Sequence, residues 1–238
     1  MFCRGVDGLM AVTGSQRACR EARKGSVMAS STAATVASRG AVPVRRAGAG
    51  DVGALSATLA AAFFDDPVFA YCYPDADRRR LILGPWFEAV VSANLDHEQT
   101  YTTSDAVGGA VWLPPGAPDD EHLGDRLAEI SGVDADRLAA IFELMEANHP
   151  EEPHYYLFLL ATRPEWQSRG VGSSLLRPVL DTCDRLAVPA YLEATSEANK
   201  RLYLRHGFQP VGEIRLPAGP SMWPMWREPN ATVPMPSR

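Results

Sequence analysis

A short segment rich in glycine and hydroxyl residues stands immediately before a stretch with helical apolar spacing. Residues 167–173 read Gln-Ser-Arg-Gly-Val-Gly-Ser. The first turn of a helix has backbone N–H groups without partners and a partial positive charge, so it binds phosphate oxygens. Gly170 and Gly172 leave room for a bulky anion, and Arg169 adds a positive charge. The segment is neither a Walker loop nor the three-glycine dinucleotide fingerprint. It predicts a site for another phosphate-bearing ligand; the alternative is a turn that only begins a helix.

Two motifs in this part of the chain resemble those of one enzyme family. Gln-x-x-Gly-x-Gly after a strand, followed by Ser-Ser-Leu-Leu, resembles motif A of the GNAT acetyltransferases. About thirty residues later, the segment 199–208 (Asn-Lys-Arg-Leu-Tyr-Leu-Arg-His-Gly-Phe) is similar to a second motif of that family. Ala-Val-Trp at 110–112 and Leu-Pro-Ala-Gly-Pro at 216–220 are similar to the puromycin N-acetyltransferase-like branch. The resemblance is specific from about His154 onward.

The resemblance implies an N-acetyltransferase that uses acetyl-CoA and moves the acetyl group directly to a small primary amine. Tyr203 would protonate the departing sulfur, although an aromatic ring that only packs is the alternative. The residues implied to bind acetyl-CoA are Leu160, Ala161, Thr162, Gln167, Ser168, Arg169, Gly170, Val171, Gly172, Ser173 and Asn199. Asn199 could instead cap a helix, and Arg169 could simply be solvated. A catalytically silent acyl-CoA-binding domain and a protein N-terminal acetyltransferase remain as rival functions.

The group that deprotonates the amine is expected among the carboxylates near the cleft. Glu193, on a strand predicted to face that cleft, is the first candidate, and His154 is the second. Four aromatic residues in the amino-terminal half could line the acceptor pocket or belong to the core: Tyr71, Tyr73, Trp86 and Phe87. Cys183 lies at an apolar helix position and is expected to pack rather than react. No metal site is expected, because the four cysteines lie far apart with no histidine at ligand spacing.

Hydrophobic periodicity predicts the elements that position these residues. Strands are expected at 42–45, 101–103, 107–113, 154–162, 189–194, 208–216 and 222–227. Helices are expected after a cap at Asp51, from 77 to 97, twice within an insertion at 119–149, and at 171–187 and 197–206. Asp65-Asp66-Pro67 should end the first helix, and Pro85 should kink the second or delay its start. The strand at 154–162 is almost entirely apolar, which is typical of a strand buried on both faces.

With the resemblance, this order implies an α/β (α+β) GNAT fold. Its sheet would be mixed, mostly antiparallel and twisted, with six to seven strands flanked by helices. The expected organisation is a disordered tail at 1–40, one acetyltransferase domain at 41–230 and a tail at 231–238. Residues 1–40 could instead be a transit peptide, and Met28 could be the true start.

Charge and apolar runs exclude some partners. Residues 1–40 carry a formal charge of +4, so the remainder carries −10 of the total of −6. An acidic body argues against nucleic acid and suits an amine. The longest apolar runs are too short to cross a bilayer. Widely spaced cysteines fit a cytoplasmic location, and the chain is expected to be a monomer or homodimer.

Overall fold

The computed structural model describes residues 42–118 and 120–230, and one mixed sheet runs through them. Its strands follow the spatial order β1-β2-β3-β4-β5-β8-β6, with β7 paired to β8. The strands are β1 (Val44–Arg46), β2 (Thr100–Thr103), β3 (Gly108–Leu113), β4 (Tyr155–Thr162), β5 (Ala190–Ala194), β6 (Gln209–Pro210), β7 (Ile214–Arg215) and β8 (Ser221–Arg227). Every pairing except β4 with β5 is antiparallel. The expected fold class is therefore confirmed, with eight strands in the described residues where six to seven were expected.

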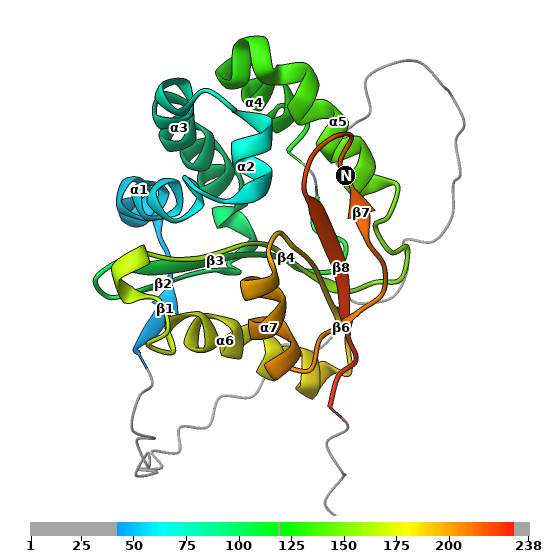
Figure 1. Cartoon of the computed structure of the whole chain (residues 1–238). Helices are drawn as coiled ribbons and strands as arrows, with labels where there is room; N and C mark the ends of the chain where they lie inside the picture. Colours follow the sequence, from blue (N-terminus) through cyan, green and yellow to red (C-terminus); the bar gives the residue numbers. More distant parts are fainter. Residues whose placement is uncertain (1–41, 119, 231–238) are drawn as a thin grey trace, which may run out of the picture. The chain divides into compact units, whose positions relative to one another are not determined.

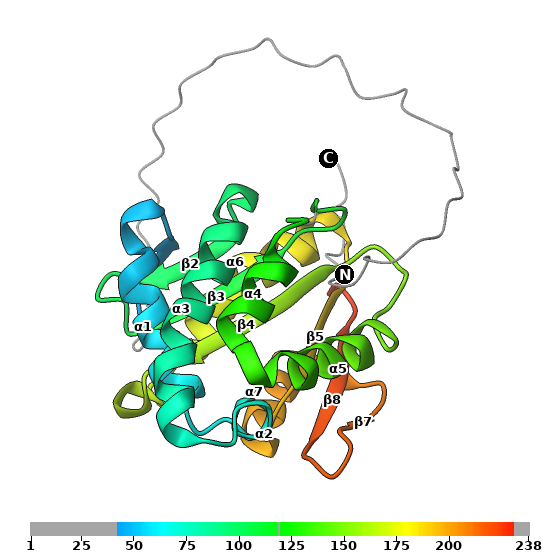
Figure 2. The ribbon, with the colours of Figure 1, turned by 90° about the horizontal axis from the view of Figure 1, so that it is seen from above.

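Helices cover both faces of this sheet (Figure 1). They are α1 (Val52–Phe63), α2 (Pro67–Cys72), α3 (Ala76–Asn94), α4 (Leu123–Ser131), α5 (Ala135–Glu146), α6 (Val171–Leu186) and α7 (Glu197–Arg205). The first five lie on one face: Figure 2 shows α1, α3 and α4 over β2 to β4, and α5 nearer β5 and β8. The other face carries α6 and α7. Each side has its own hydrophobic core, so the sheet separates two packed layers.

The two parallel strands at the centre of the sheet separate soon after they meet. Tyr155 pairs with Ala190 and Tyr156 pairs with Tyr191, and no later residues of β4 and β5 pair. Six further residues of β4 continue along β3 alone. The divergence opens the centre of the sheet and leaves the end of β4 without a partner on one edge.

A β-bulge at Phe158 lies where the two strands separate. Leu159 is opposite Val111 and Leu157 is opposite Trp112, so Phe158 is the extra residue that the bulge inserts into β4. Before the bulge, Leu157 packs in the core that contains α6; after it, Leu159 packs in the core of α1 and α3. Odd-numbered side chains of β4 therefore point toward α6 before the bulge and toward α1 and α3 after it.

The structure corrects several expectations about single elements. The strand at 154–162 is not among them, because it is packed on both faces as expected: Tyr155 and Leu157 are buried in one core, Leu159 and Ala161 in the other, and the residues between them are half-buried. The expected strand at 208–216 is two short strands, because its register against β8 slips by one residue between them. The helix with Pro85 does not start late but begins at Ala76, where Asp75 accepts hydrogen bonds from two backbone N–H groups. Asp51 makes no side-chain cap to α1; its carboxylate binds Arg45 and the Gly48 N–H.

A helix that the sequence analysis missed follows the break at residues 65–67. Pro67 occupies the first turn of α2, and the carboxylate of Asp66 accepts hydrogen bonds from the N–H groups of Val68 and Phe69. The motif that ends α1 thus also starts α2. The expectations for residues 1–40 and 231–238 concern segments outside the described residues. Among the helices that the structure describes, none is both long and apolar enough to span a membrane.

Candidate active site

A cavity with about 890 Å³ of free space, its opening to solvent included, lies at the open side of β4. It is bounded by the end of β4, the segment before α6, and α7. Its lining residues are Leu160, Ala161, Thr162, Trp166, Gln167, Ser168, Gly170, Val171, Gly172, Ser173, Ala198, Asn199, Leu202, Tyr203 and Arg205. We call it the donor cleft. It follows directly from the separation of β4 and β5.

The segment before α6 presents backbone N–H groups to the donor cleft. Ser168 and Gly170 adopt positive φ values of 60° and 84°, and Gly170 is the N-cap of α6 without a side chain to occupy that place. The first helical N–H bond runs from Ser174 to the Gly170 carbonyl, so the preceding N–H groups have no partner within the helix. A Cβ atom at Gly172 would lie 3.2 Å from Leu202 Cδ2. The turn is therefore shaped to hold an anion close to the backbone.

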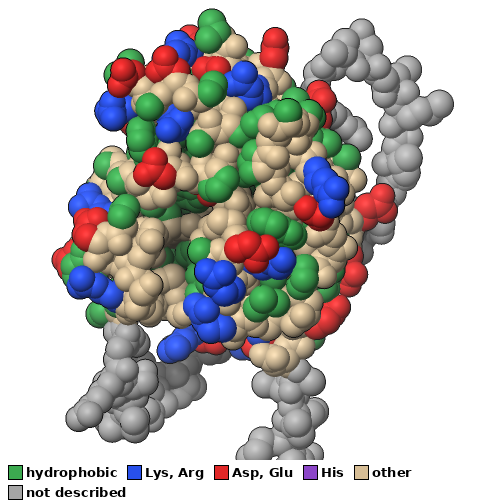
Figure 3. Space-filling view, viewed as in Figure 1, with side chains coloured by type: hydrophobic (Ala, Val, Ile, Leu, Met, Phe, Trp, Pro, Cys, Tyr) green, Lys and Arg blue, Asp and Glu red, His purple; other side chains and the backbone are tan. Residues whose placement is uncertain are grey.

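The donor cleft brings together almost all residues predicted to bind coenzyme. Ten of the eleven line it, as does Tyr203. The exception is Arg169, which is exposed and whose guanidinium lies 5.2 Å from the ring centre of Trp166. Four lining residues were missed because no motif marks them: Trp166, Ala198, Leu202 and Arg205. Basic side chains gather over α7, as Figure 3 shows, and those of Arg201 and Arg205 are exposed.

Tyr203 lies buried on α7 at the wall of the donor cleft. Its hydroxyl makes no hydrogen bond to any residue within 42–118 or 120–230. Burial and the nearby carboxylate of Asp66 raise the Tyr203 pKa far above its ordinary value. The hydroxyl is therefore protonated at neutral pH and can donate. The start of this helix is capped by Ser196, so the cap alternative for Asn199 is wrong.

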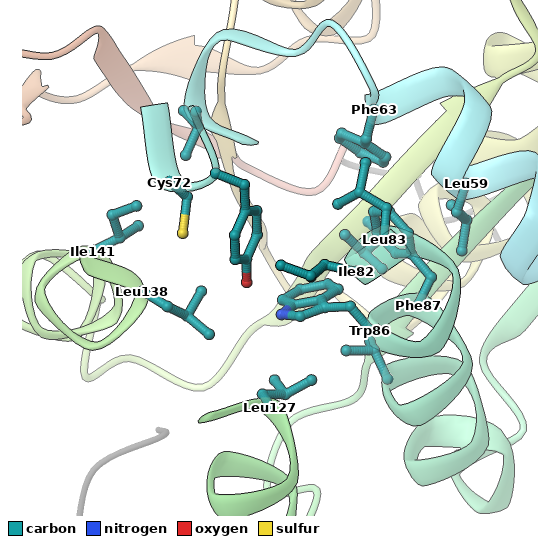
Figure 4. Packing of buried hydrophobic residues seen from close by; sticks show 14 of the residues in the cluster. Leu59, Phe63, Cys72, Ile82, Leu83, Trp86, Phe87, Leu127, Leu138 and Ile141 are labelled. Carbon is teal, nitrogen blue, oxygen red and sulfur yellow. The ribbon is translucent and has the colours of Figure 1, made fainter. Parts of the chain in front are cut away.

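A second cavity, with about 590 Å³ of free space when its opening to solvent is included, lies on the other side of the divergence. We call it the acceptor pocket. Its lining residues are Phe63, Val68, Phe69, Cys72, Trp86, Leu138, Ile141, Phe142, Met145, Phe158, Leu159, Glu193, Thr195 and Met222. Figure 4 shows Leu138 and Ile141 coming from α5 on one side, and Trp86 and Phe63 from α3 and α1 on the other. The predicted helical insertion thus supplies one wall of the pocket, although Asp119, its expected first residue, is outside the described residues.

Glu193 is the one carboxylate in this apolar lining. Its Oε2 accepts a 2.8 Å hydrogen bond from the Tyr156 hydroxyl, and its Oε1 is buried with no partner among the described residues. Burial raises the Glu193 pKa to about 7, while the hydrogen bond from Tyr156 acts in the opposite direction. The carboxylate can therefore gain and lose a proton near neutral pH.

A chain of hydrogen bonds connects the two cavities. The Asn199 side-chain amide donates to Thr195 Oγ1 at 3.4 Å, and Thr195 Oγ1 donates to Asp66 Oδ2 at 2.5 Å. Asn199 lines the donor cleft and Thr195 the acceptor pocket, while Asp66 starts α2. The chain fixes the α2 wall of the pocket to the start of α7. Sequence reasoning missed Asp66, because next to proline it was interpreted only as a helix breaker.

Most of the other candidate residues lie away from both cavities. His154 lines neither; it is buried, its Nδ1 lies 2.6 Å from the Glu152 carbonyl oxygen, and its pKa is lowered by burial. Of the four aromatic candidates, Trp86 lines the acceptor pocket and Phe87 is core. Tyr73 bonds to the Ser131 hydroxyl at 2.7 Å and Tyr71 to the Pro217 carbonyl at 2.8 Å.

The two described cysteines are protonated thiols. Cys183 is fully buried in the α6 core, as expected, and burial raises its pKa to about 12. Cys72 lines the acceptor pocket, and burial raises its pKa to about 12 as well. Neither is a thiolate nucleophile at neutral pH. Among residues 42–118 and 120–230, no three His, Cys, Asp or Glu side chains form a group that could hold a metal ion.

Comparison with known proteins shows which protein family this chain resembles. The model of the Acetyltransferase (GNAT) family matches residues 97–208, which include both motifs and the donor cleft. An uncharacterized N-acetyltransferase of Schizosaccharomyces pombe is 25% identical over 180 residues, covering 69% of this chain and 73% of that protein. These findings support a GNAT acetyltransferase. They do not distinguish branches within the family, so the puromycin N-acetyltransferase-like branch is not confirmed.

Solved structures agree with the GNAT assignment. The crystal structure of histone acetyltransferase HPA2 and related acetyltransferase from Corynebacterium glutamicum is 29% identical, with a TM-score of 0.62, and covers 81% of this chain and 99% of that one. Arylalkylamine N-acetyltransferase 2 from Aedes aegypti is 15% identical with a TM-score of 0.59, covering 79% and 99%. The second similarity concerns the fold alone. Helices on both faces of a mostly antiparallel sheet are thus common to the GNAT neighbours and this chain.

Proposed function

We propose that the protein transfers an acetyl group from acetyl-CoA to the primary amine of a small molecule. One observation carries the proposal: the donor cleft and the acceptor pocket lie on two sides of the β4–β5 divergence. A hydroxyl that can donate a proton, on Tyr203, lines the first, and a carboxylate that can accept one, on Glu193, lines the second. Acetyl transfer to an amine needs both groups.

The donor cleft fits acetyl-CoA. Its pyrophosphate would be held by backbone N–H groups of residues 167–173, with the exposed arginines of α7 nearby. The unpaired edge of β4 at residues 160–162 would hold the pantetheine and the acetyl carbonyl through its backbone. Arg169 lies outside the lining, so we assign it no contact.

Two residues would handle the protons of the reaction. Glu193 accepts a proton from the ammonium form of the bound amine, and the freed nitrogen attacks the thioester carbonyl. The C–N bond forms and the C–S bond breaks, the Tyr203 hydroxyl protonates the departing sulfur, and the Tyr203 phenolate regains a proton as the nitrogen of the new amide loses its second proton. Because Cys72 and Cys183 are protonated thiols, an acetylated cysteine is not a favoured intermediate, and we propose direct transfer within a ternary complex.

The position of α5 supports a small acceptor over a protein N-terminus. Leu138, Ile141 and Met145 from this helix form part of the pocket lining, where a protein substrate would need an open groove. The placement of Tyr203 and Glu193 at the two cavities argues against a silent coenzyme-binding domain.

The test is calorimetry of acetyl-CoA with the full chain, followed by release of free thiol in the presence of a panel of primary amines. Saturable binding and amine-dependent thiol release are expected. Binding without thiol release for any amine would favour the silent binder, and absence of binding would refute the proposal.

A further inference from the structure

The lining of the acceptor pocket is sharply divided in polarity. Of its fourteen residues, Glu193 carries the one carboxylate, and none carries a cationic group. Thr195 adds a hydroxyl that is already bonded to Asp66, and the Cys72 thiol stays protonated. The remaining lining side chains are aliphatic, aromatic or thioether groups. A ligand therefore meets one charge and an otherwise apolar enclosure.

Aromatic rings make up much of that enclosure. Five come from separate elements or loops and surround the space: Phe63, Phe69, Trp86, Phe142 and Phe158. Phe69 packs edge-on against Trp86 with ring centres 5.2 Å apart, and lies 5.2 Å from Phe63. Such rings bury apolar and aromatic ligand groups well; their one polar atom, the buried Trp86 Nε1–H, is a donor and so cannot accept a hydrogen bond from a second ammonium group.

We propose that the acceptor is a primary monoamine with an apolar body, aromatic or aliphatic; this rests on the proposed function. Glu193 receives the reacting amino group, and the rings and α5 enclose the rest. A second cationic group at the far end of the molecule would be buried without a carboxylate to pair with it. Diamines, polyamines and guanidino amines are therefore poor acceptors, although the protein as a whole is acidic.

The test uses a pair of amines of equal chain length, hexylamine and hexane-1,6-diamine, with 2-phenylethylamine as the aromatic member. Thiol release from acetyl-CoA is followed with the full chain. The kcat/KM for hexylamine and 2-phenylethylamine is expected to exceed that for the diamine by roughly tenfold or more, because one buried unpaired charge costs at least that much in binding.

A variant pair then checks that the pocket itself sets this preference. Met145 is half-buried on α5, so Met145→Glu adds a carboxylate to the lining and Met145→Gln adds an uncharged group of the same shape. Met145→Glu should improve the kcat/KM of the diamine relative to hexylamine by about tenfold, and Met145→Gln should not. Leu81→Glu, at an α3 residue that is 75% exposed, controls for added charge elsewhere.

The outcomes separate this inference from the function on which it rests. If amines are acetylated but the diamine equals or exceeds hexylamine, the monoamine proposal is wrong and the acetyltransferase stands. If Leu81→Glu and Met145→Glu change the preference equally, the pocket does not set it and the proposal also fails. If acetyl-CoA binds and no amine is acetylated, the proposed function is overturned and this inference with it.

Discussion

The Tyr156 hydroxyl on β4 donates a 2.8 Å hydrogen bond to the Glu193 carboxylate on β5. Tyr156 belongs to the last pairing between these strands, opposite Tyr191, and Glu193 lies two positions beyond that pairing on β5, where the sheet begins to open. Tyr156 fixes one oxygen of the carboxylate and leaves the other facing away from it. A carboxylate held in this way has both a defined direction and a pKa close to neutrality.

Glu193→Gln should lower kcat/KM for amine acetylation by about a hundredfold or more, because removal of a general base has effects of roughly 10²–10⁴. The wild-type rate should rise with pH through about 7, as Glu193 loses its proton. An ordinary alkylamine has a pKa of about 10, so the amine itself does not cause this rise in rate near neutral pH, which we call the acid limb. The limb should be absent in the variant, while acetyl-CoA affinity stays within about twofold of the wild type.

Pre-steady-state and steady-state pH profiles check this, with Glu143→Gln on the exposed side of α5 as the matched control. A variant that keeps the wild-type profile would exclude Glu193 as the base.

Tyr156→Phe should move the same limb to higher pH. The hydrogen bond from the hydroxyl lowers the Glu193 pKa, so its loss leaves burial to raise that pKa further. A hydrogen bond to a charged group contributes about 1.5–3 kcal/mol, which corresponds to a shift of about one to two pH units. The rate at high pH should stay close to wild type. A uniform loss at all pH values, with no shift, would show that Tyr156 acts in packing alone.

Tyr203→Phe should lower kcat by about a hundredfold, because the departing sulfur loses its proton donor. The affinity for acetyl-CoA, measured by calorimetry, should change by less than about twofold, since the ring still fills its place. Tyr101→Phe is the control: its hydroxyl bonds to Gln99 and it lies in neither cavity. Unchanged turnover in Tyr203→Phe would remove this residue from the mechanism.

Gly172→Glu should weaken acetyl-CoA binding by about a hundredfold or more. A Cβ atom there meets Leu202 at 3.2 Å, and the carboxylate would enter the space where the pyrophosphate is proposed to lie. Gly53→Glu places the same group on α1, where a Cβ atom meets nothing within 4 Å, and should bind acetyl-CoA normally. Thermal unfolding of both variants establishes that they are folded; equal affinity in the two would contradict the placement of the coenzyme.

The donor side of the site was accessible from sequence because its determinants are local. A strand, a glycine turn and an amphipathic helix follow one another between residues 155 and 186, and each has its own signal in residue spacing. Nine of the ten predicted residues that line the cleft lie in this stretch, and the tenth, Asn199, lies on α7. Arg169, the eleventh predicted residue, does not line the cleft, since the direction of a long side chain on an exposed loop depends on a neighbour, here Trp166.

The acceptor side was harder to predict because its determinants are far apart in the chain. Residues from α1, α2, α3, α5, β4, β5 and β8 line one pocket, and no motif connects them. The short helix α2 has too few residues for a periodic signal, so Asp66 and Phe69 were not recognised. The bulge at Phe158 has no sequence signature within an apolar strand. Without knowledge of the bulge, the face of the sheet toward which each β4 side chain points cannot be assigned.

That bulge also divides the protein into parts that can change independently. Side chains that line the acceptor pocket come largely from α1, α2, α3 and α5, and those of the donor cleft from α6, α7 and the segments beside them. Under the proposed function, substitutions that change the accepted amine can therefore accumulate in these helices without disturbing coenzyme affinity. If β4 kept Phe158 but lost the bulge, this independence would be lost, because Leu159 and every later side chain of β4 would turn to the opposite face; deletion of Phe158 would instead close the bulge and leave those side chains on their present faces.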